Sequence, residues 1–361
     1  MFNNTSSLLG LNISNPEELS ANFSAISTTV VFILSITAII LVLYLFYRVD
    51  NLSKKPFNVF MLNLIITDFV YCIWENAFDI GIDFLPSYWK TRNSVICSVY
   101  LYSNYTLQAA TCNAHMLITL NRLWAILFPH SYKSSQKISV FAAVCLGKWI
   151  YLHIVMMPGF IADILYYRQN VSSNGCFFDI AAQPTWNLIM IVLLFVTPLV
   201  VMVVSYPFIY YKYRVRRHEL QRLRPLPLSQ LTIPSKITNN DSQLPQHSLE
   251  RKPTGTQHSQ GASKSAIKLE IAKSNSQTML ILTMLTTSAT ICWTPNIVVF
   301  MVYTFIPFPE DLTVFSVVAF IFSVQLLMDP VLFVISLSDL REAFRELIAG
   351  VTDRFRQLFQ C

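Results

Sequence analysis

The sequence predicts an all-α membrane protein, a seven-transmembrane helix bundle with a short amphipathic eighth helix. Of its 361 residues, 53% are hydrophobic and 13% are charged, which is about half the charged share of a soluble domain. The apolar residues fall in seven blocks, each long enough to cross ~30 Å of hydrocarbon. The predicted spans are 25–47, 57–82, 94–127, 139–162, 185–213, 272–305 and 311–337.

The third block is among the more polar blocks, and a charge lies near its end. Arg122 stands in the stretch Asn121–Pro129, about seven helical turns after Cys97. A charge at the end of a span is costly to bury, so it marks either a boundary or a mechanism. Because seven turns carry a helix across a bilayer, we expect Cys97 and Arg122 at opposite faces.

Basic residues set the predicted orientation. Lysines and arginines cluster after the first, third and fifth spans, whereas residues 1–24 contain Glu17, Glu18 and no base. By the positive-inside rule, the N-terminus is extracellular and the C-terminus cytoplasmic, which suits a multi-pass protein of the plasma membrane. The basic patches are then cytoplasmic loops, so we expect the lipid bilayer, and no nucleic acid, as a partner.

Composition divides the chain further. Residues 1–24 are polar and lack a basic n-region, which predicts an extracellular tail without a cleavable signal peptide. The bundle covers 25–337 and is interrupted by 214–270, whose Pro, Gln, Ser and Thr content predicts a disordered third cytoplasmic loop. Residues 338–361 hold apolar side chains at helical spacing among charges, as in a helix lying on a membrane surface, before a short tail.

Modification sites follow from this orientation. Cys97 and Cys176 are the two cysteines on the oxidising side, so they can form a disulfide. Cys361, the last residue, is a candidate for palmitoylation, with a free thiol as the alternative. Sequons on the outer side make the following residues candidates for glycosylation: Asn3, Asn4, Asn12, Asn22 and Asn170. Two aromatic runs, Ile164–Arg168 and Cys176–Ile180, flank a polar turn and predict a hairpin.

The spans hold short patterns that resemble those of the rhodopsin-like (class A) G-protein-coupled receptors. The patterns are Leu62-Asn63-Leu64 with Asp68, Cys97 with Asn121–Pro129, Trp149 with Pro158, Pro198 with Tyr206, Cys292-Trp293-Thr294-Pro295, and Asp329-Pro330-Val331-Leu332-Phe333. Each is weak alone, but their order and spacing over 25–350 are specific. The resemblance implies a receptor that converts an extracellular ligand into activation of a heterotrimeric G protein, with arrestin and receptor kinases as further partners.

The resemblance also implies a switch at the inner half of the bundle. In this family the residue matching Arg122 is restrained by acids and then contacts the G protein. Here Asn121 and Asn275 stand where those acids are usual, so we expect raised basal signalling. The other implied switch residues are Tyr206, Trp293, Pro295, Asp329, Pro330 and Phe333, the last in place of the usual Tyr.

Asp68 lies near mid-bilayer and needs a cation, a proton or hydrogen-bond donors. The resemblance implies an allosteric sodium ion there, with Thr111 and Asp329 as companions and no other cofactor. Two neighbouring acids favour a cation or a shared proton, so we expect sodium- or pH-sensitive signalling. His115, inside the third span, is interpreted as a hydrogen-bonded core residue, and Lys148, inside the fourth, as a snorkelling side chain.

Two residues that are absent from the sequence exclude two ligand classes of this family. Amine receptors of this family carry an Asp where Asn104 stands, and opsins need a seventh-span Lys that 312–338 lacks. Acids in the outer half, together with the hairpin, favour a basic or amidated peptide. The candidate ligand-binding residues are Glu75, Asp79, Asn104, Tyr105, Gln108, Asn296, Phe300, Phe320 and Ser323.

Other functions stay open or are disfavoured. A small-molecule or chemosensory receptor remains an alternative, as does a receptor-like decoy or scaffold with weak coupling. A transporter or channel is disfavoured because no internal repeat or charged pathway is evident. An enzyme is disfavoured because the sequence offers no nucleophile–base pair and no metal-binding cluster.

Overall fold

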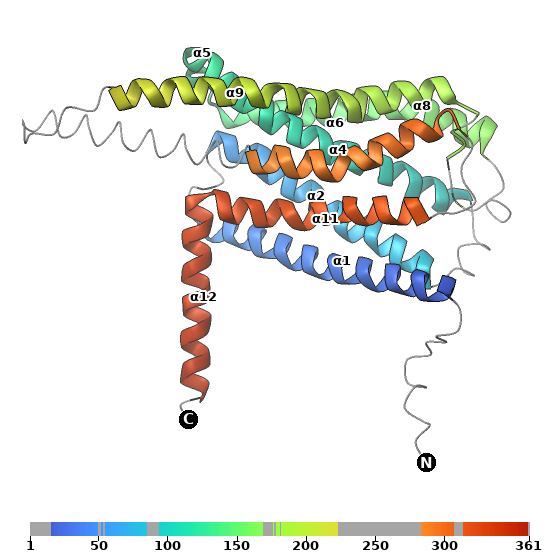
Figure 1. Cartoon of the computed structure of the whole chain (residues 1–361), viewed down its shortest axis with the longest axis horizontal. Coiled ribbons are helices and arrows are strands. Elements are labelled where there is room, and N and C mark those ends of the chain that lie inside the picture. Colours follow the sequence, from blue (N-terminus) through green and yellow to red (C-terminus); the bar gives the residue numbers. More distant parts are fainter. Residues whose placement is uncertain are drawn as a thin grey trace, which may run out of the picture. The chain divides into compact units, whose positions relative to one another are not determined.

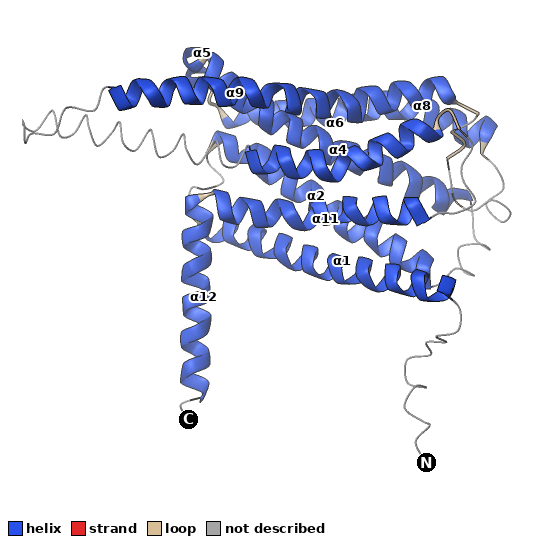
Figure 2. Ribbon diagram, in the orientation of Figure 1, coloured by secondary structure: helices blue, strands red, loops and turns tan. Residues whose placement is uncertain are grey.

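The computed structural model describes residues 16–49, 52, 55–84, 94–168, 176, 178–180, 182–222, 283–306 and 313–359. The chain divides into two compact units, Met1–Ile209 with Leu280–Cys361, and Tyr210–Met279. Of the second unit only the end of one helix, up to Arg222, is described. The described residues form helices and turns, without a strand (Figure 2).

Seven long helical segments run through the described residues, and two further helices follow the third and the last of them (Figure 1). The long segments are α1 (Pro16–Arg48), α2 (Pro56–Phe84), α4 (Ser94–Leu127), α6 (Ile138–Ala162) with the π-helical η1 (Asp163–Tyr167), α8 (Pro184–Ile191) with the π-helical η2 (Val192–Val196) and α9 (Thr197–Arg222), the helix Thr283–Tyr303, here called the Trp293 helix, and α11 (Thr313–Ser336). The others are α5 (Pro129–Ser134) and α12 (Ser338–Phe359).

Six of the described helices are long and apolar enough to cross a membrane, and α4 is not among them. Its interior carries buried polar side chains, including Thr111, Asn113 and His115. With 34 residues it is nevertheless long enough to span, and it packs against α2, α6 and η2. The third predicted span is therefore an interior helix, whose polar groups meet other helices instead of lipid.

The outer faces of the helices are apolar. On α6, Leu146 and Ile154 are 62% and 67% exposed, and such a surface is suited to hydrocarbon. The inner face of α6 allows close packing at Gly159, where a Cβ atom would overlap the ring of Trp186 in α8. The fold is thus buried on the inside and lipid-compatible on the outside, as its hydropathy predicts.

Two predicted boundaries are shifted, because helices extend into segments that were predicted as a tail and as a loop. α1 begins at Pro16, inside the segment 1–24, because proline suits the first helical turn and the glutamates after it suit a helix N-terminus. α9 continues to Arg222, past position 214, since its last turns consist mainly of strong helix formers. Residues 223–270, the rest of the predicted cytoplasmic loop, lie outside the described residues, as do 271–282, which include the predicted start of the sixth span.

The predicted hairpin is wrong in its first arm. Ile164–Tyr167 belongs to η1, a π-helical continuation of α6. The Arg168 backbone N–H donates to the Asp163 carbonyl at 2.7 Å, and the two side chains form a buried ion pair. These local bonds outweigh the strand preference of an aromatic run, which is weak outside a sheet. In the second arm, Ile180 N–H bonds to the Phe178 carbonyl at 3.0 Å, forming a turn.

Candidate functional site

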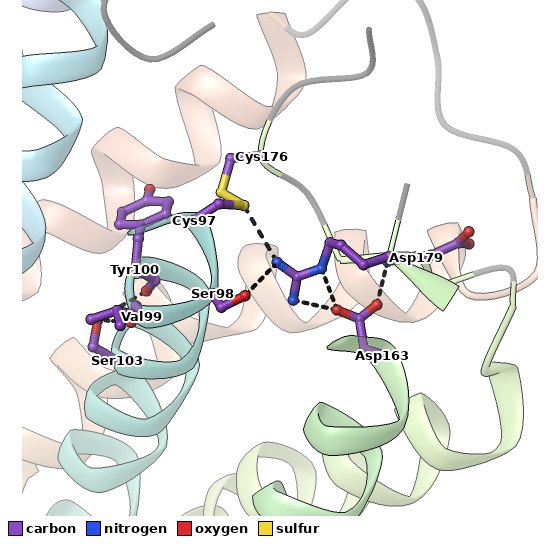
Figure 3. The surroundings of a disulfide bond; sticks show 9 residues. Cys97, Ser98, Val99, Tyr100, Ser103, Asp163, Cys176 and Asp179 are labelled. Atoms are coloured by element: carbon purple, nitrogen blue, oxygen red, sulfur yellow. Dashed lines mark hydrogen bonds and ion pairs between the residues drawn. A yellow bond between two sulfur atoms is a disulfide. The ribbon is translucent and has the colours of Figure 1, made fainter. Parts of the chain in front are cut away.

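A disulfide joins Cys97, at the start of α4, to Cys176, as predicted (Figure 3). Beside it, Arg168 Nη1 lies 3.4 Å from Cys97 Sγ and 3.3 Å from Ser98 Oγ. The Arg168 guanidinium also pairs with Asp163, whose side chain is fully buried. The covalent bond and the ion pair thus fasten the segment after α6 to the same end of the bundle, here called the disulfide end.

A pocket lies between α4, α8 with η2, and the Trp293 helix. Its walls carry aromatic, aliphatic and carboxamide side chains and no charged group. The lining residues are Tyr105, Gln108, Met190, Ile191, Phe195, Asn296, Ile297 and Phe300. Four predicted ligand-binding residues therefore meet here: Tyr105, Gln108, Asn296 and Phe300. The pocket suits a neutral ligand group that offers both apolar surface and hydrogen bonds.

The other predicted ligand-binding residues are not part of this lining. Asn104 supports it indirectly, because its Oδ1 accepts a hydrogen bond from Gln108 Nε2 at 2.6 Å. Ser323 Oγ donates to the Ala319 carbonyl of its own helix at 2.9 Å, and Phe320 also lies on α11. Glu75 and Asp79 belong to α2, but their side chains lie outside the described part of the structure.

Trp293 is fully buried beneath this pocket. Its ring lies 6.1 Å from that of Phe195, which lines the pocket, and 4.7 Å from Phe322 of α11, edge to face. The indole Nε1 has no hydrogen-bond partner within the described residues. Trp293 therefore connects the pocket to α11 through aromatic packing, an arrangement that tolerates a change of contact at low cost.

The irregular segment η2 shapes one wall of the pocket. Pro198 lacks an N–H, so the Leu194 carbonyl loses its helical donor. Asn113 Nδ2 of α4 donates to that carbonyl at 3.0 Å, and Tyr151 of α6 donates its hydroxyl to the Leu193 carbonyl at 3.2 Å. Side chains of two neighbouring helices therefore satisfy backbone groups that the proline and the π turn release.

A buried polar cluster lies deeper in the bundle. Asp68 and Asp329 are both fully buried. Thr111 Oγ1 donates to Asp68 Oδ1 at 3.2 Å, Gln325 Nε2 donates to Asp329 Oδ1 at 2.7 Å, and His115 Nε2 lies 3.0 Å from Asp329 Oδ2. His115 is thus a hydrogen-bonded interior residue, as interpreted, but its partner Asp329 was not predicted. The sequence feature that could have indicated this cluster is the presence of one histidine and two acids within the predicted spans.

The opposite end of the bundle, here called the Arg122 end, holds the predicted switch. Within the described residues Arg122 forms no salt bridge, and its Cζ lies 3.2 Å from the centroid of the Phe57 ring. Both polar side-chain atoms of Asn121 are buried without a partner there. Phe57 was not predicted. Asn275 lies outside the described residues.

The remaining predicted switch residues lie on three helices, α9, α11 and the Trp293 helix. The Tyr206 hydroxyl accepts a hydrogen bond from Thr283 Oγ1 at 3.4 Å. Phe333 is fully buried, as suits a ring without a hydroxyl. Pro330 lies inside α11, and Pro295 inside the Trp293 helix.

The fold and these sites define a helical membrane protein of the receptor type. The profile of the family described as 7 transmembrane receptor (rhodopsin family) matches residues 38–333, and the chain belongs to this family. Six spans of the family bundle are selected by hydropathy, and the one that hydropathy alone does not select is the third, α4. The resemblance seen in the sequence is thereby confirmed.

Individual relatives are distant. The chain is 23% identical over 210 residues to a G-protein coupled receptor homolog of fowlpox virus, covering 54% of this chain and 63% of that protein. It is 26% identical over 184 residues to cholecystokinin receptor type A of Rattus norvegicus, covering 49% and 41%. It is 22% identical over 203 residues to muscarinic acetylcholine receptor M4 of Gallus gallus, covering 54% and 41%. The matches thus span only about half the length of such relatives.

The predicted modification sites stay predictions. The glycosylation candidates Asn3, Asn4, Asn12 and Asn170 lie outside the described residues, as does Cys361. Asn22 falls within α1, but its side chain is also outside the described part.

Proposed function

We propose that this chain is a plasma-membrane receptor that converts binding of an extracellular ligand, most of all a peptide, into activation of a heterotrimeric G protein. The disulfide end faces outward and the Arg122 end faces the cytoplasm. One observation carries the proposal: the uncharged pocket shares Phe195 with the packing around Trp293. A ligand in the pocket therefore touches a side chain that touches the buried tryptophan.

The lining favours a peptide over an amine. Without a carboxylate in the pocket, a cationic amine would lose its hydration without gaining an ion pair. Asn296 makes no hydrogen bond within the described residues and is free to pair with a backbone amide or a terminal amide. Gln108, by contrast, is already engaged by Asn104 and by the Tyr71 hydroxyl. Relatives named for the peptide cholecystokinin support the same ligand class.

Transmission follows the aromatic contacts. A ligand seated against Phe300 and Phe195 shifts Phe195, and Trp293 changes its packing against Phe322 of α11. α11 carries Asp329, and its pair with His115 links that helix to α4, which ends near Arg122. The two ends of the bundle are therefore coupled through aromatic contacts, the helices α11 and α4, and the Asp329–His115 pair, and two-state repacking of such contacts can carry a signal.

The Arg122 end supplies the partner surface. Arg122 is restrained by an aromatic ring instead of an acid, so it is available to a carboxyl-rich or carbonyl-rich helix end. We propose the G protein as its partner, with arrestin and receptor kinases as later ones. The small-molecule receptor remains the second candidate, because the same neutral pocket admits a compact uncharged compound.

A peptide-library screen in cells carrying a panel of G-protein activation biosensors tests this proposal. We expect a peptide hit whose response is abolished by Arg122→Ala and whose half-maximal concentration rises about tenfold in Asn296→Leu, the effect of one lost hydrogen bond with its desolvation. Ser323→Ala, outside the pocket lining, is the matched control and keeps the wild-type response. Full signalling by Arg122→Ala, or a peptide response indifferent to Asn296→Leu, would contradict the proposal.

A further inference from the structure

We propose that His115 is part of a buried polar latch that holds α11 and the Trp293 helix against α4 in the resting receptor. The polar latch consists of four side chains: His115 of α4, Ser288 of the Trp293 helix, and Gln325 and Asp329 of α11. Its effect on signalling rests on the proposed function, because the latch restrains the switch described there. Its effect on the mobility of the helices does not.

The first bond of the polar latch joins α4 to α11. His115 Nε2 lies 3.0 Å from Asp329 Oδ2, and the two side chains are 1% and 0% exposed. The backbones of these two helices pack mainly elsewhere, α4 against α2 and α6, and α11 against α1. The bond between His115 and Asp329 therefore joins two helices that are not close packing partners. Because both groups are shielded from water, removing one of them leaves the other unsatisfied.

Gln325 extends the polar latch to a third helix. Its Nε2 donates to Asp329 Oδ1 at 2.7 Å and lies 3.5 Å from Ser288 Oγ of the Trp293 helix. A carboxamide nitrogen carries two hydrogens, so it makes both contacts at once. The contact with Ser288 is long and therefore the weaker of the two. Gln325 and Ser288 are both buried, so the four side chains connect three helices in the interior of the bundle.

The donors around Asp329 suit a hydrogen-bonded latch and do not suit a metal ion. One carboxylate oxygen faces the amide nitrogen of Gln325 and the other faces the imidazole of His115. A carboxylate only accepts hydrogen bonds, so both neighbours turn N–H groups towards it. A sodium ion at this carboxylate would meet those N–H groups instead of oxygen lone pairs, and Asp329 therefore does not fit as its ligand. For Asp68 and Thr111 the sodium ion stays a prediction.

Prolines weaken the two helices that the polar latch holds on α4. Pro330 directly follows Asp329 and offers no N–H to the Leu326 carbonyl four residues earlier. In the Trp293 helix, Pro295 lies about two turns from Ser288, on the side of the pocket. Helices bend at such prolines, so the segments of both helices towards the Arg122 end can pivot. The polar latch restrains both segments next to these weak points.

The polar latch also lies between the pocket and Arg122. Trp293 packs edge to face on Phe322 at 4.7 Å, and Phe322 is three residues from Gln325, on the same face of α11. His115 and Arg122 are seven residues apart, so they lie on nearly the same face of α4. A change of packing at Trp293 therefore reaches the latch one turn further along α11. Opening the latch releases α11 from the face of α4 that carries Arg122.

Two measurements on His115→Leu test the polar latch. The first is hydrogen–deuterium exchange of the purified receptor in detergent, where we expect faster exchange in 283–287 and 331–336 and no change in the middle of α6. The second is ligand-independent G-protein activation per receptor at the cell surface. We expect it to rise about twofold to tenfold, the effect of losing one buried hydrogen bond. His115→Gln keeps an N–H donor near the position of the imidazole Nε2 and should return both readouts towards the wild type.

The matched control is Thr119→Val, one turn along α4. It removes a buried hydroxyl that bonds, in the part of the chain that the structure describes, only within its own helix, and it should change neither readout. If His115→Leu does not reach the cell surface, the double variant His115→Leu/Asp329→Asn replaces the unpaired carboxylate by a neutral amide. This variant should be expressed and should show the same fast exchange.

The outcomes separate the polar latch from the proposed function. Unchanged exchange in a folded His115→Leu receptor would overturn the latch, as would a His115→Gln variant that behaves like His115→Leu. Faster exchange at both helix ends without any G-protein activation supports the latch and contradicts the proposed function. Faster exchange together with raised activation supports both.

Discussion

The guanidinium of Arg122 lies over the ring of Phe57, with Cζ 3.2 Å from the ring centroid. Phe57 stands at the start of α2, and Arg122 lies near the end of α4, so the contact joins two helices that the chain separates widely. A cation over an aromatic face gains about 0.5–2 kcal/mol. The restraint on Arg122 is therefore present but weaker than a buried ion pair, which refines the expectation of raised basal signalling.

Phe57→Leu removes the ring and keeps an apolar side chain of similar bulk. Because about 0.5–2 kcal/mol is lost from the restrained state, we expect ligand-independent signalling to rise about twofold to thirtyfold, up to the ceiling of the assay. The measurement is G-protein biosensor activity per receptor at the cell surface. Phe57→Tyr preserves the ring and should stay at the wild-type level; equal basal activity in all three proteins would sink the restraint.

Asn113 is predicted to stabilise η2, the π-helical part of the fifth span. Asn113→Leu leaves the Leu194 carbonyl, which Pro198 deprives of its helical donor, without a partner in the described residues. A buried unsatisfied carbonyl costs about 1–3 kcal/mol, so thermal unfolding should occur at a clearly lower temperature. Thr119→Val is the control, since the Thr119 hydroxyl bonds, among the residues that the structure describes, only to the His115 carbonyl of its own helix. An equal loss in both variants would argue against a special role for Asn113.

The buried pair Asp163–Arg168 should behave as a unit. Removing one partner leaves an uncompensated charge among buried groups, at a cost of about 3–5 kcal/mol. We therefore expect Asp163→Ala and Arg168→Ala each to lower surface expression and thermal stability sharply. The double variant should be less harmful than the sum of the single ones, and the double-mutant cycle measures this difference. Additive losses would mean that the two side chains act independently.

The ion pair of Lys55 with Asp339 joins the segment before α2 to the first turn of α12, with Nζ 2.5 Å from Oδ2. The hydrogen bond from Lys55 lowers the pKa of Asp339 below its usual 3.8. A lowered pKa stabilises the fold above pH 3.8, and this contribution is lost as the pH falls through the folded-state value. We expect no pH dependence from this pair between about pH 5 and 8.

The same pair is largely exposed, with 59% and 39% of the two side chains accessible. Asp339→Asn should therefore cost less than about 1 kcal/mol at neutral pH, and high salt should shrink the effect. The exchanged variant Lys55→Glu/Asp339→Lys should recover most of the loss in a thermal shift measurement. A failure of the exchange would point to a role of Asp339 at the N-terminus of α12 instead.

Much of the bundle could be predicted because hydropathy and spacing report directly on burial in lipid. The position of α4 could be predicted although its composition is polar, since the separation of Cys97 and Arg122 fixes a membrane crossing. Its polar residues could not be assigned partners, because His115 meets Asp329 only after the whole chain has folded. Arg122 was expected to have no carboxylate partner. Its contact with Phe57 could not be predicted, because no residue near Arg122 in the sequence indicates it.

The errors have local causes. Ile164–Tyr167 has the composition of a strand, but the bond between Asp163 and Arg168 holds it in a helical turn. Lys148 has the composition of a snorkelling residue, but its side chain is buried and its Nζ donates to the Ala110 carbonyl of α4 instead of reaching the surface. Half of the pocket lining could be predicted from residue type and family position. Met190, Ile191 and Phe195 could not, because η2 shifts the face that the fifth span presents.

The π-helical segment Val192–Val196 also sets how this chain can tolerate change in length. A π turn contains about one residue more than an α turn, so deleting a single residue there would restore regular α geometry. Everything after it would then keep its position around the helix axis, because the π turn offsets the following residues by about 100°, the angle that one α-helical residue occupies. Tyr206 would stay near Thr283 and Met202 would stay in the core, whereas a deletion in a regular part of the same span would turn the residues after it to another face. A one-residue deletion should therefore be better tolerated in this short stretch than elsewhere in the span.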